Sequence, residues 1–186
     1  MEKSVDFGHV LVVVDYRTGR VRCQVPGKNA RTSAPGASWG SAEHPAGLDR
    51  PRGPWNPAAG AALAVVFAIK RGGNRATAMH RLTAAIRTVS STCHGPATHG
   101  QATAAVLAVR RAAWNLPGRT ACLEESAAVV ILLAMRRLGV TWCHGIAPDP
   151  VRLHAWVRTW DGGLAAEPVS TNVYTPALTI GEPRGH

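Results

Sequence analysis

An apolar run that begins at Cys122 has the spacing of a buried helix, and the chain changes to strand-like segments directly after it. The expected buried stripe of this helix consists of Leu123, Ala127, Val130, Ile131, Ala134 and Leu138. Three more helical segments come before it, at residues 57–71, 75–89 and 101–115. The strands expected for the core come after it, at residues 140–145, 152–160, 164–167 and 173–180. Because helices and strands follow one another in blocks, the sequence predicts an α+β fold.

The 186 residues are enough for one well-buried core and too few for two large ones. Residues 1–26 alternate apolar and polar positions around a turn at residues 17–19, which predicts a β-hairpin. Residues 27–56 are dense in Pro, Gly, Ser and Ala, a composition typical of a flexible linker. Residues 57–186 are then expected to form the main domain. The longest apolar stretch, residues 58–69, is shorter than the roughly 20 residues that a membrane-spanning helix needs.

The chain is strongly basic, with a formal net charge of +10 and an isoelectric point near 10.7. Such a surface attracts acidic peptides, nucleic acids or anionic membranes. The helical arginines lack the interleaved aromatic residues that stack on bases, so we expect solvated helix faces and no nucleic-acid partner. These arginines are Arg71, Arg75, Arg81, Arg87, Arg110 and Arg111. The four cysteines show no close-paired spacing and no signal segment begins the chain, so we expect free thiols in a cytoplasmic protein.

Two residues are candidates for a catalytic pair. We expect Thr120 to be the N-cap of the fourth helix and Gly139 to close it, which places Cys122 at the second helical position. There, unpaired amides and the positive end of the helix dipole stabilise a thiolate and can bind an oxyanion. A lone cysteine at a helix start is also commonly a small buried hydrophobe. His154, in a strand-like segment, is equally either a base or a hydrogen-bonded core residue.

The third candidate is an acidic partner for His154. Residues 161–163 read Asp-Gly-Gly, a hairpin-turn sequence, so the strand that carries His154 should fold back onto residues 164–169. With a turn of even length, Glu167 shares a sheet face with His154 and can orient the imidazole. Asp161 has the wrong strand parity and is expected to be a structural turn residue. A turn of odd length or a bulge would reverse this assignment.

Two neighbouring pairs, Cys93-His94 and Cys143-His144, raise the alternative of a zinc site. Adjacent side chains on a strand point to opposite faces, which disfavours these pairs as ligands. We therefore expect neither a metal nor any other cofactor.

Four segments together carry a specific combination of residues. They are Cys-Leu-x-x-Ser at residues 122–126, Thr-Trp-Cys-His-Gly at 141–145, His-Ala-Trp-Val at 154–157 and Ala-Glu-Pro at 166–168. In this combination the chain resembles the lasso-peptide leader peptidase family, which are transglutaminase-like cysteine proteases. The resemblance runs from about residue 57 to residue 180 and is closest between residues 118 and 168.

The resemblance implies a papain/transglutaminase-like core in which a cysteine-bearing helix accompanies a C-terminal antiparallel sheet. It also implies removal of the leader from a ribosomally made lasso precursor peptide through an acyl-enzyme. Cys122 would be the nucleophile, His154 the general base and acid, and Glu167 the acidic partner, with no metal or nucleotide required. The chain departs from the family at Arg158 and Thr159, which replace an acidic position.

In this family a leader-recognition module is either fused ahead of the peptidase or made separately. Residues 1–56 hold one expected hairpin and a linker, which is too little for that module. We therefore expect a separate recognition protein, with the N-terminal hairpin as its candidate docking edge through strand addition. A separate ATP-dependent lasso cyclase would act after cleavage, and a membrane exporter is a further candidate partner.

Two other functions stay open at this point. Enzymes of the same fold use an acyl-enzyme for amide transfer or deamidation, and the choice of the second nucleophile distinguishes them from peptidases. The alternative from another class is a noncatalytic basic adaptor that binds an acidic peptide or nucleic acid, in which Cys122 is merely buried.

Overall fold

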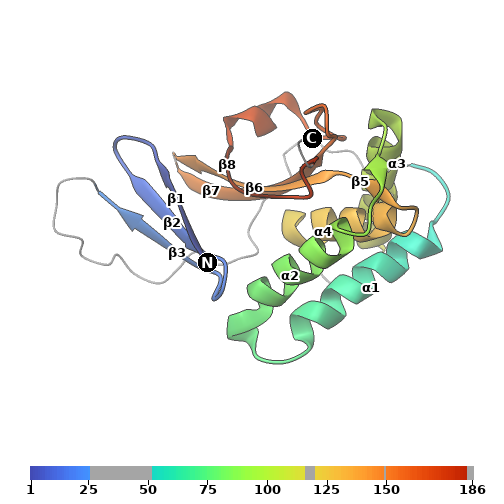
Figure 1. Ribbon diagram of the computed structural model, residues 1–186, viewed down its shortest axis with the longest axis horizontal. Coiled ribbons are helices and arrows are strands. Elements are labelled where there is room, and N and C mark those ends of the chain that lie inside the picture. The colour runs from blue at the N-terminus through green and yellow to red at the C-terminus, as the bar shows by residue number, and fades with distance from the viewer. Residues whose placement is uncertain (26–51, 116–119, 149, 184–186) are drawn as a thin grey trace.

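The computed structural model describes residues 1–25, 52–115, 120–148 and 150–183. The expected linker at residues 27–56 lies almost wholly outside the described residues. Helices and core strands occur in separate blocks along the chain, which confirms the α+β prediction. Figure 1 shows the helices gathered on one side of the molecule and the long antiparallel strands on the other.

The helical layer follows the predicted segments closely. Its members are α1 (Pro57–Arg71), α2 (Ala78–Ser90), α3 (His99–Trp114) and α4 (Cys122–Ala134), with a short 3-10 turn, η1 (Arg75–Thr77), before α2. α1 begins after Asn56, whose side chain accepts hydrogen bonds from the amides of Ala58 and Ala59. The first turn of α3 is closed by a reciprocal capping box between Thr98 and Gln101.

α4 is the central helix, because it packs against α1, α2, α3 and the sheet, and most of its residues are buried. It begins one residue later than predicted. Its N-cap is Ala121, so Cys122 is the first helical residue. The prediction of Thr120 as N-cap is wrong, since the Thr120 hydroxyl donates instead to the Glu125 carboxylate at 2.7 Å. The amide of Ala121 is satisfied by Glu124, one turn along, at 3.1 Å.

The C-terminus of α4 also differs from the prediction. The helix ends at Ala134, and Arg137 then adopts a left-handed conformation with a φ of 59°. The chain next enters a short strand, β5 (Leu138–Gly139), which pairs in parallel with β4 (Gly95–Pro96). Gly139 is therefore a strand residue and not a helix-closing glycine, because Arg137 takes the backbone conformation that glycine usually supplies at a helix end.

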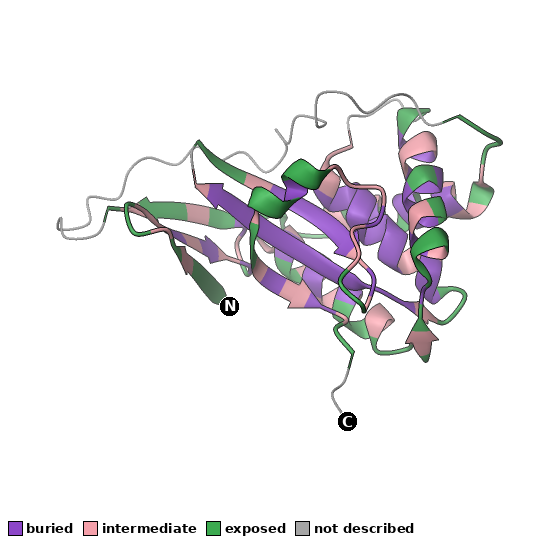
Figure 2. Ribbon diagram, turned by 90° about the horizontal axis from the view of Figure 1, so that it is seen from above, coloured by how far each residue is buried: buried purple, intermediate pink, exposed green. Residues whose placement is uncertain are grey.

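The main sheet has three antiparallel strands in the order β7-β6-β8. Their bounds are Thr141–Pro148 for β6, Val151–Arg158 for β7 and Thr175–Ile180 for β8. The register places Gly145 of β6 directly opposite His154 of β7. Figure 2 shows buried residues concentrated along the long strands and the helix beside them, so both faces of this sheet are covered.

The predicted strand at residues 164–167 does not form. After β7 the chain makes a single antiparallel bridge, between Arg158 and Leu164, and then leaves the sheet. Ala166 has a φ of 51°, which turns the backbone away from the extended path. A 3-10 helix, η2 (Val169–Val173), follows before the chain returns as β8.

The N-terminal segment holds one strand more than the predicted hairpin. β1 (Glu2–Asp6), β2 (Leu11–Asp15) and β3 (Arg20–Gln24) form an antiparallel sheet in the order β1-β2-β3. The predicted hairpin corresponds to β2 and β3, while the alternation in β1 is weak because four of its five residues are exposed. Val12, Val14 and Tyr16 are fully buried, and β1 contacts β8, so the small sheet is packed on the main core.

Among the described residues, no helix is both long enough and apolar enough to cross a membrane.

Candidate active site

The first turn of α4 presents Cys122 half-buried at the amino end of the helix. Amide groups in a first helical turn have no partner within the helix, so they converge on this end and favour negative charge there. The Glu124 carboxylate in the same turn forms an ion pair with Lys70 of α1 and accepts a hydrogen bond from the amide of Ala121. Glu124 therefore caps the helix start, and Lys70 balances its negative charge.

His154 lies on β7, where it is buried and in contact with two aromatic rings. Its imidazole stacks on Trp156 at a centroid distance of 5.7 Å and lies 5.2 Å from the ring of Tyr174. Nε2 donates a hydrogen bond to Oε2 of Glu167 at 2.9 Å. Because Nε2 is engaged by the carboxylate, Nδ1 is the ring nitrogen left to face Cys122, with which His154 also hydrogen-bonds.

The charge state of His154 follows from these contacts. Burial by itself lowers the pKa of His154, but hydrogen bonds to Cys122 and Glu167 and the negative charges of both groups raise it to about 9. The titratable groups around the ring are thus Cys122 from α4, Glu167 from the segment after β7, Tyr174 from the segment after η2, and His144 from β6. An imidazolium is favoured at neutral pH, as required beside a thiolate.

Glu167 approaches His154 by a route that the strand-parity reasoning did not foresee. The turn after β7 joins Arg158 to Leu164, which is the odd-length connection that reverses the predicted parity. The carboxylate nevertheless meets the imidazole, because the chain turns at Ala166 and leaves the sheet before Glu167. The predicted contact between Glu167 and His154 is present, and the geometric reason given for it was wrong.

Asp161 is a turn residue, as predicted. Its carboxylate accepts hydrogen bonds from the Thr159 hydroxyl and, at 3.3 Å, from the amide of Gly163. These hydrogen bonds lower the pKa of Asp161, and the one from the Thr159 hydroxyl has the largest effect. Its side chain is occupied within the turn and does not serve His154.

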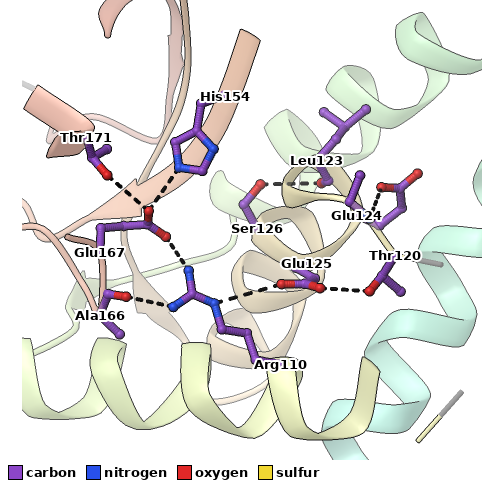
Figure 3. A network of polar contacts seen from close by, with 11 residues as sticks. Arg110, Thr120, Leu123, Glu124, Glu125, Ser126, His154, Ala166, Glu167 and Thr171 are labelled. Carbon is purple, nitrogen blue, oxygen red and sulfur yellow. Dashed lines mark hydrogen bonds and ion pairs between the residues drawn. The ribbon is translucent and has the colours of Figure 1, made fainter. Parts of the chain in front are cut away.

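Figure 3 shows a polar network that joins His154 and Glu167 to Arg110 and to the first turn of α4. Oε2 of Glu167 also accepts from the Thr171 hydroxyl at 3.2 Å, and its Oε1 accepts from the Arg110 guanidinium at 2.5 Å. Arg110 in turn lies 3.8 Å from Oε2 of Glu125, the residue that binds Thr120. The network therefore leads from the segment after β7 through α3 to the first turn of α4.

Arg110 and Glu125 were missed by the sequence reasoning. Arg110 was expected on a solvated helix face, but its side chain is only 13% exposed and forms ion pairs with two carboxylates. The available signal was the polar run Glu124-Glu125-Ser126 inside a helix that is otherwise apolar on all sides, since buried carboxylates need a cation.

A second buried polar chain supports the site from the other side. The indole of Trp142 on β6 donates to the Ser126 hydroxyl of α4 at 2.9 Å. Trp142 stacks on His144, which shares a 2.7 Å hydrogen bond with the hydroxyl of Tyr16 from the N-terminal sheet. Burial, with the nearby His154, lowers the pKa of His144 to about 3, so this second histidine stays neutral.

In the part of the chain that the structure describes, no three His, Cys, Asp or Glu side chains are grouped as a metal site. Cys143 of the alternative zinc set is buried and its thiol points to the carbonyl of Thr141, while Cys93 points to the carbonyl of Leu138. Each of the two thiols therefore donates to a different backbone carbonyl.

The arrangement is suited to nucleophilic catalysis. A thiol at a helix start lies against an imidazole whose protonated form is favoured, and a buried carboxylate holds the far side of the ring. The order nucleophile, histidine, acid is what an acyl transfer to sulfur requires.

Comparison with known proteins agrees with this reading. Residues 61–179 match the model of a family described as the transglutaminase-like superfamily, and the matched segment contains Cys122, His154 and Glu167. No curated protein and no solved structure gives a significant match to the chain.

Proposed function

Because the chain belongs to the transglutaminase-like superfamily, we propose that it is a cysteine peptidase that removes the leader from a ribosomally made lasso precursor peptide. Enzymes of this superfamily are generally of the cysteine type. The observation that carries the proposal is the Cys122–His154–Glu167 arrangement inside the matched segment. The narrower choice of substrate is supported by the sequence elements around Cys122 and His154 that resemble the lasso leader peptidases.

The proposed reaction begins with attack of the Cys122 thiolate on the scissile carbonyl carbon. The carbonyl oxygen becomes an oxyanion, which amides at the start of α4 stabilise. When the carbon–nitrogen bond breaks, the His154 imidazolium gives its proton to the departing amine of the core peptide. The leader is then held as a thioester on Cys122.

Water completes the cycle. His154, now neutral, takes a proton from a water molecule as the oxygen attacks the thioester carbonyl. The leader leaves with a new carboxyl group, and the thiolate and imidazolium are restored. Throughout, the Glu167 carboxylate keeps the imidazole oriented and stabilises its charged form.

Burial of charge argues against the noncatalytic adaptor. Glu167 has a side chain that is 4% exposed, and that of His154 is 8% exposed, yet the two form an ion pair when His154 is protonated. A buried imidazole–carboxylate pair beside a thiol at a helix start is the arrangement that a nucleophilic site needs, and a binding adaptor has no use for it.

The basic surface and the small N-terminal sheet support a separate leader-recognition protein as partner. β3 is an edge strand that carries Arg20 and Arg22 and is largely exposed. An acidic extended segment of that protein would pair with this edge. Replacement of both arginines by Gln should weaken the association. Because Arg22 also forms an ion pair with Glu2 of β1, the fold of the variant is checked by circular dichroism. Unchanged affinity would exclude this edge as the docking site.

The test of the proposed function is mass spectrometry of a lasso precursor from the same gene neighbourhood. The peptide is incubated with the protein, with and without the recognition partner, beside Cys122→Ala. We expect two fragments that add up to the precursor plus one water, and only with the intact thiol. An intact precursor under all conditions, with folded protein, would contradict the proposal.

The same spectra separate the alternatives. Deamidation would keep the chain whole and change its mass by the difference between an amide and an acid, while amide transfer would add the mass of an amine donor. Binding without any mass change, insensitive to Cys122→Ala and strongly weakened by salt, would identify an adaptor.

A further inference from the structure

Arg110 makes three contacts that converge on the candidate site (Figure 3). Nη2 donates to Oε1 of Glu167 at 2.5 Å, and Nη1 donates to the carbonyl oxygen of Ala166 at 2.7 Å. Nε lies 3.8 Å from Oε2 of Glu125. One planar guanidinium therefore links the acid of the triad, the backbone before it and the helix that carries Cys122.

These contacts bring a positive charge to two buried carboxylates. The side chains of Glu125 and Glu167 are 9% and 4% exposed, and a buried carboxylate needs a cation beside it. The Arg110 guanidinium is that cation for both side chains.

The contacts also control where Glu167 points. Ala166 has a positive φ, which costs a residue other than glycine conformational energy and persists only when its surroundings hold it. The hydrogen bond from Arg110 to the Ala166 carbonyl holds this backbone, and the second arm of the fork holds Oε1 of Glu167. With Oε1 held, Oε2 is left facing His154.

We propose that Arg110 is a positioning residue of the active site, which acts through Glu167 to keep the His154 imidazole oriented and charged. This inference deepens the proposed function and rests on it. Arg110 does not touch the reacting atoms. Its role is to fix, from α3, the carboxylate that the imidazole needs.

The test measures His154 by NMR titration of its imidazole, which requires no substrate, in Arg110→Lys and Arg110→Met. We expect the pKa of His154 to fall by about 1 unit or more in Arg110→Met, because the contacts that hold the Glu167 carboxylate against the imidazole are lost. Arg110→Lys keeps the charge but not the fork, so we expect a smaller fall and a protein that folds. Arg111→Met is the matched control, since Arg111 donates to the carbonyls of Arg52 and Pro54 instead.

A second measurement asks whether the effect passes through Glu167. In a Glu167→Gln background, Arg110→Lys should no longer change the pKa of His154, and the deviation from additivity reports the coupling. An unchanged or raised pKa in Arg110→Lys and Arg110→Met would overturn the proposal, as would an effect that persists without the Glu167 carboxylate. Because these titrations do not use a peptide, their outcome is separate from whether the lasso precursor is cleaved.

Discussion

The imidazole of His154 is held between a thiol and a carboxylate, and its charge depends on the second of these. Glu167→Gln keeps the size of the side chain and removes its charge. We expect the pKa of His154 to fall from about 9 by about 1–3 units, because a carboxylate at 2.9 Å favours the charged ring. The alkaline limb of the kcat/KM profile should move to lower pH by the same amount.

The matching readout is kcat, which we expect to fall by about 10²-fold or more with little change in KM, since Glu167 acts on the imidazole and not on the substrate. Asp161→Asn is the control, because Asp161 is confined to its turn. Equal effects of the two substitutions would show that Glu167 is not the acidic partner of His154.

The sequence predicted the residue types of the candidate site but not all of their contacts. Cys122 and His154 lie at a helix start and in a strand pattern that are local in the chain, and the resemblance of the motifs around them to the lasso leader peptidases singled them out. Arg110 was not, because its partners lie 56 and 57 residues away and only the fold makes them neighbours. An arginine with such distant partners looks the same in sequence as one on a solvated face.

The strands β6 and β7 position the His154 imidazole, and they pack closely at Gly145. Gly145 faces His154 across the strands, and a methyl group at Gly145 would lie 2.7 Å from the Trp156 ring and 2.9 Å from the carbonyl of Thr175. Trp156 stacks on His154, so Gly145→Ala should displace both rings. We expect a loss of about 1–3 kcal/mol in the free energy of unfolding, together with a loss of the proposed peptidase activity.

Urea unfolding and the cleavage assay test this substitution together. Gly100→Ala in α3 is the control, because nothing lies within 4 Å of its added methyl group. If Gly145→Ala were as stable and active as Gly100→Ala, the stacked arrangement around His154 would not be needed.

The N-terminal sheet reaches the core through Tyr16, whose hydroxyl bonds His144 at 2.7 Å. Tyr16→Phe removes one buried hydrogen bond, and we expect the free energy of unfolding to fall by about 1–2 kcal/mol. The small sheet is packed on the main core, so we expect the two to unfold together. The lower free energy of unfolding should therefore appear in a single transition. A separate early transition of β1–β3, followed by amide hydrogen exchange, would show instead that the sheet is an independent appendage.

The elements themselves were largely predictable where their periodicity was strong. α1, α2 and α3 and the strands β6, β7 and β8 fell within a few residues of expectation. The errors lie where tertiary contacts override local preference. α4 stops at Ala134, and Leu138 and Gly139 beyond it pair with β4. Residues 164–167 leave the sheet at the point where Arg110 bonds Ala166 and Glu167.

For the whole molecule, His144 sets a limit on acid stability. Burial lowers its pKa to about 3 in the folded protein, while the unfolded chain binds a proton at the usual value near 6.5. The unfolded state therefore binds more protons between these values, and stability is present above pH 6.5 and falls as the pH is lowered. Between pH 6.5 and pH 4 this group alone should cost about 3 kcal/mol.

Urea denaturation at a series of pH values measures this slope. His144→Gln removes the titrating group and should flatten the part of the slope that belongs to it. A stability that stays constant from pH 6.5 to pH 4 would contradict the burial of a neutral His144 at the centre of the fold.

The rate at which iodoacetamide alkylates Cys122, mapped by mass spectrometry, measures whether this thiol is activated. At pH 6.5 an ordinary thiol is only about 1% ionised, so a free thiol such as glutathione is the reference. The exposed Cys23 of the same molecule is a poorer reference, because burial raises its pKa. We predict that Cys122 reacts roughly tenfold or more faster than glutathione, and that His154→Ala abolishes the difference. If Cys122 of the native protein reacted no faster than glutathione, the thiol would not be an activated nucleophile and the proposed peptidase function would fail.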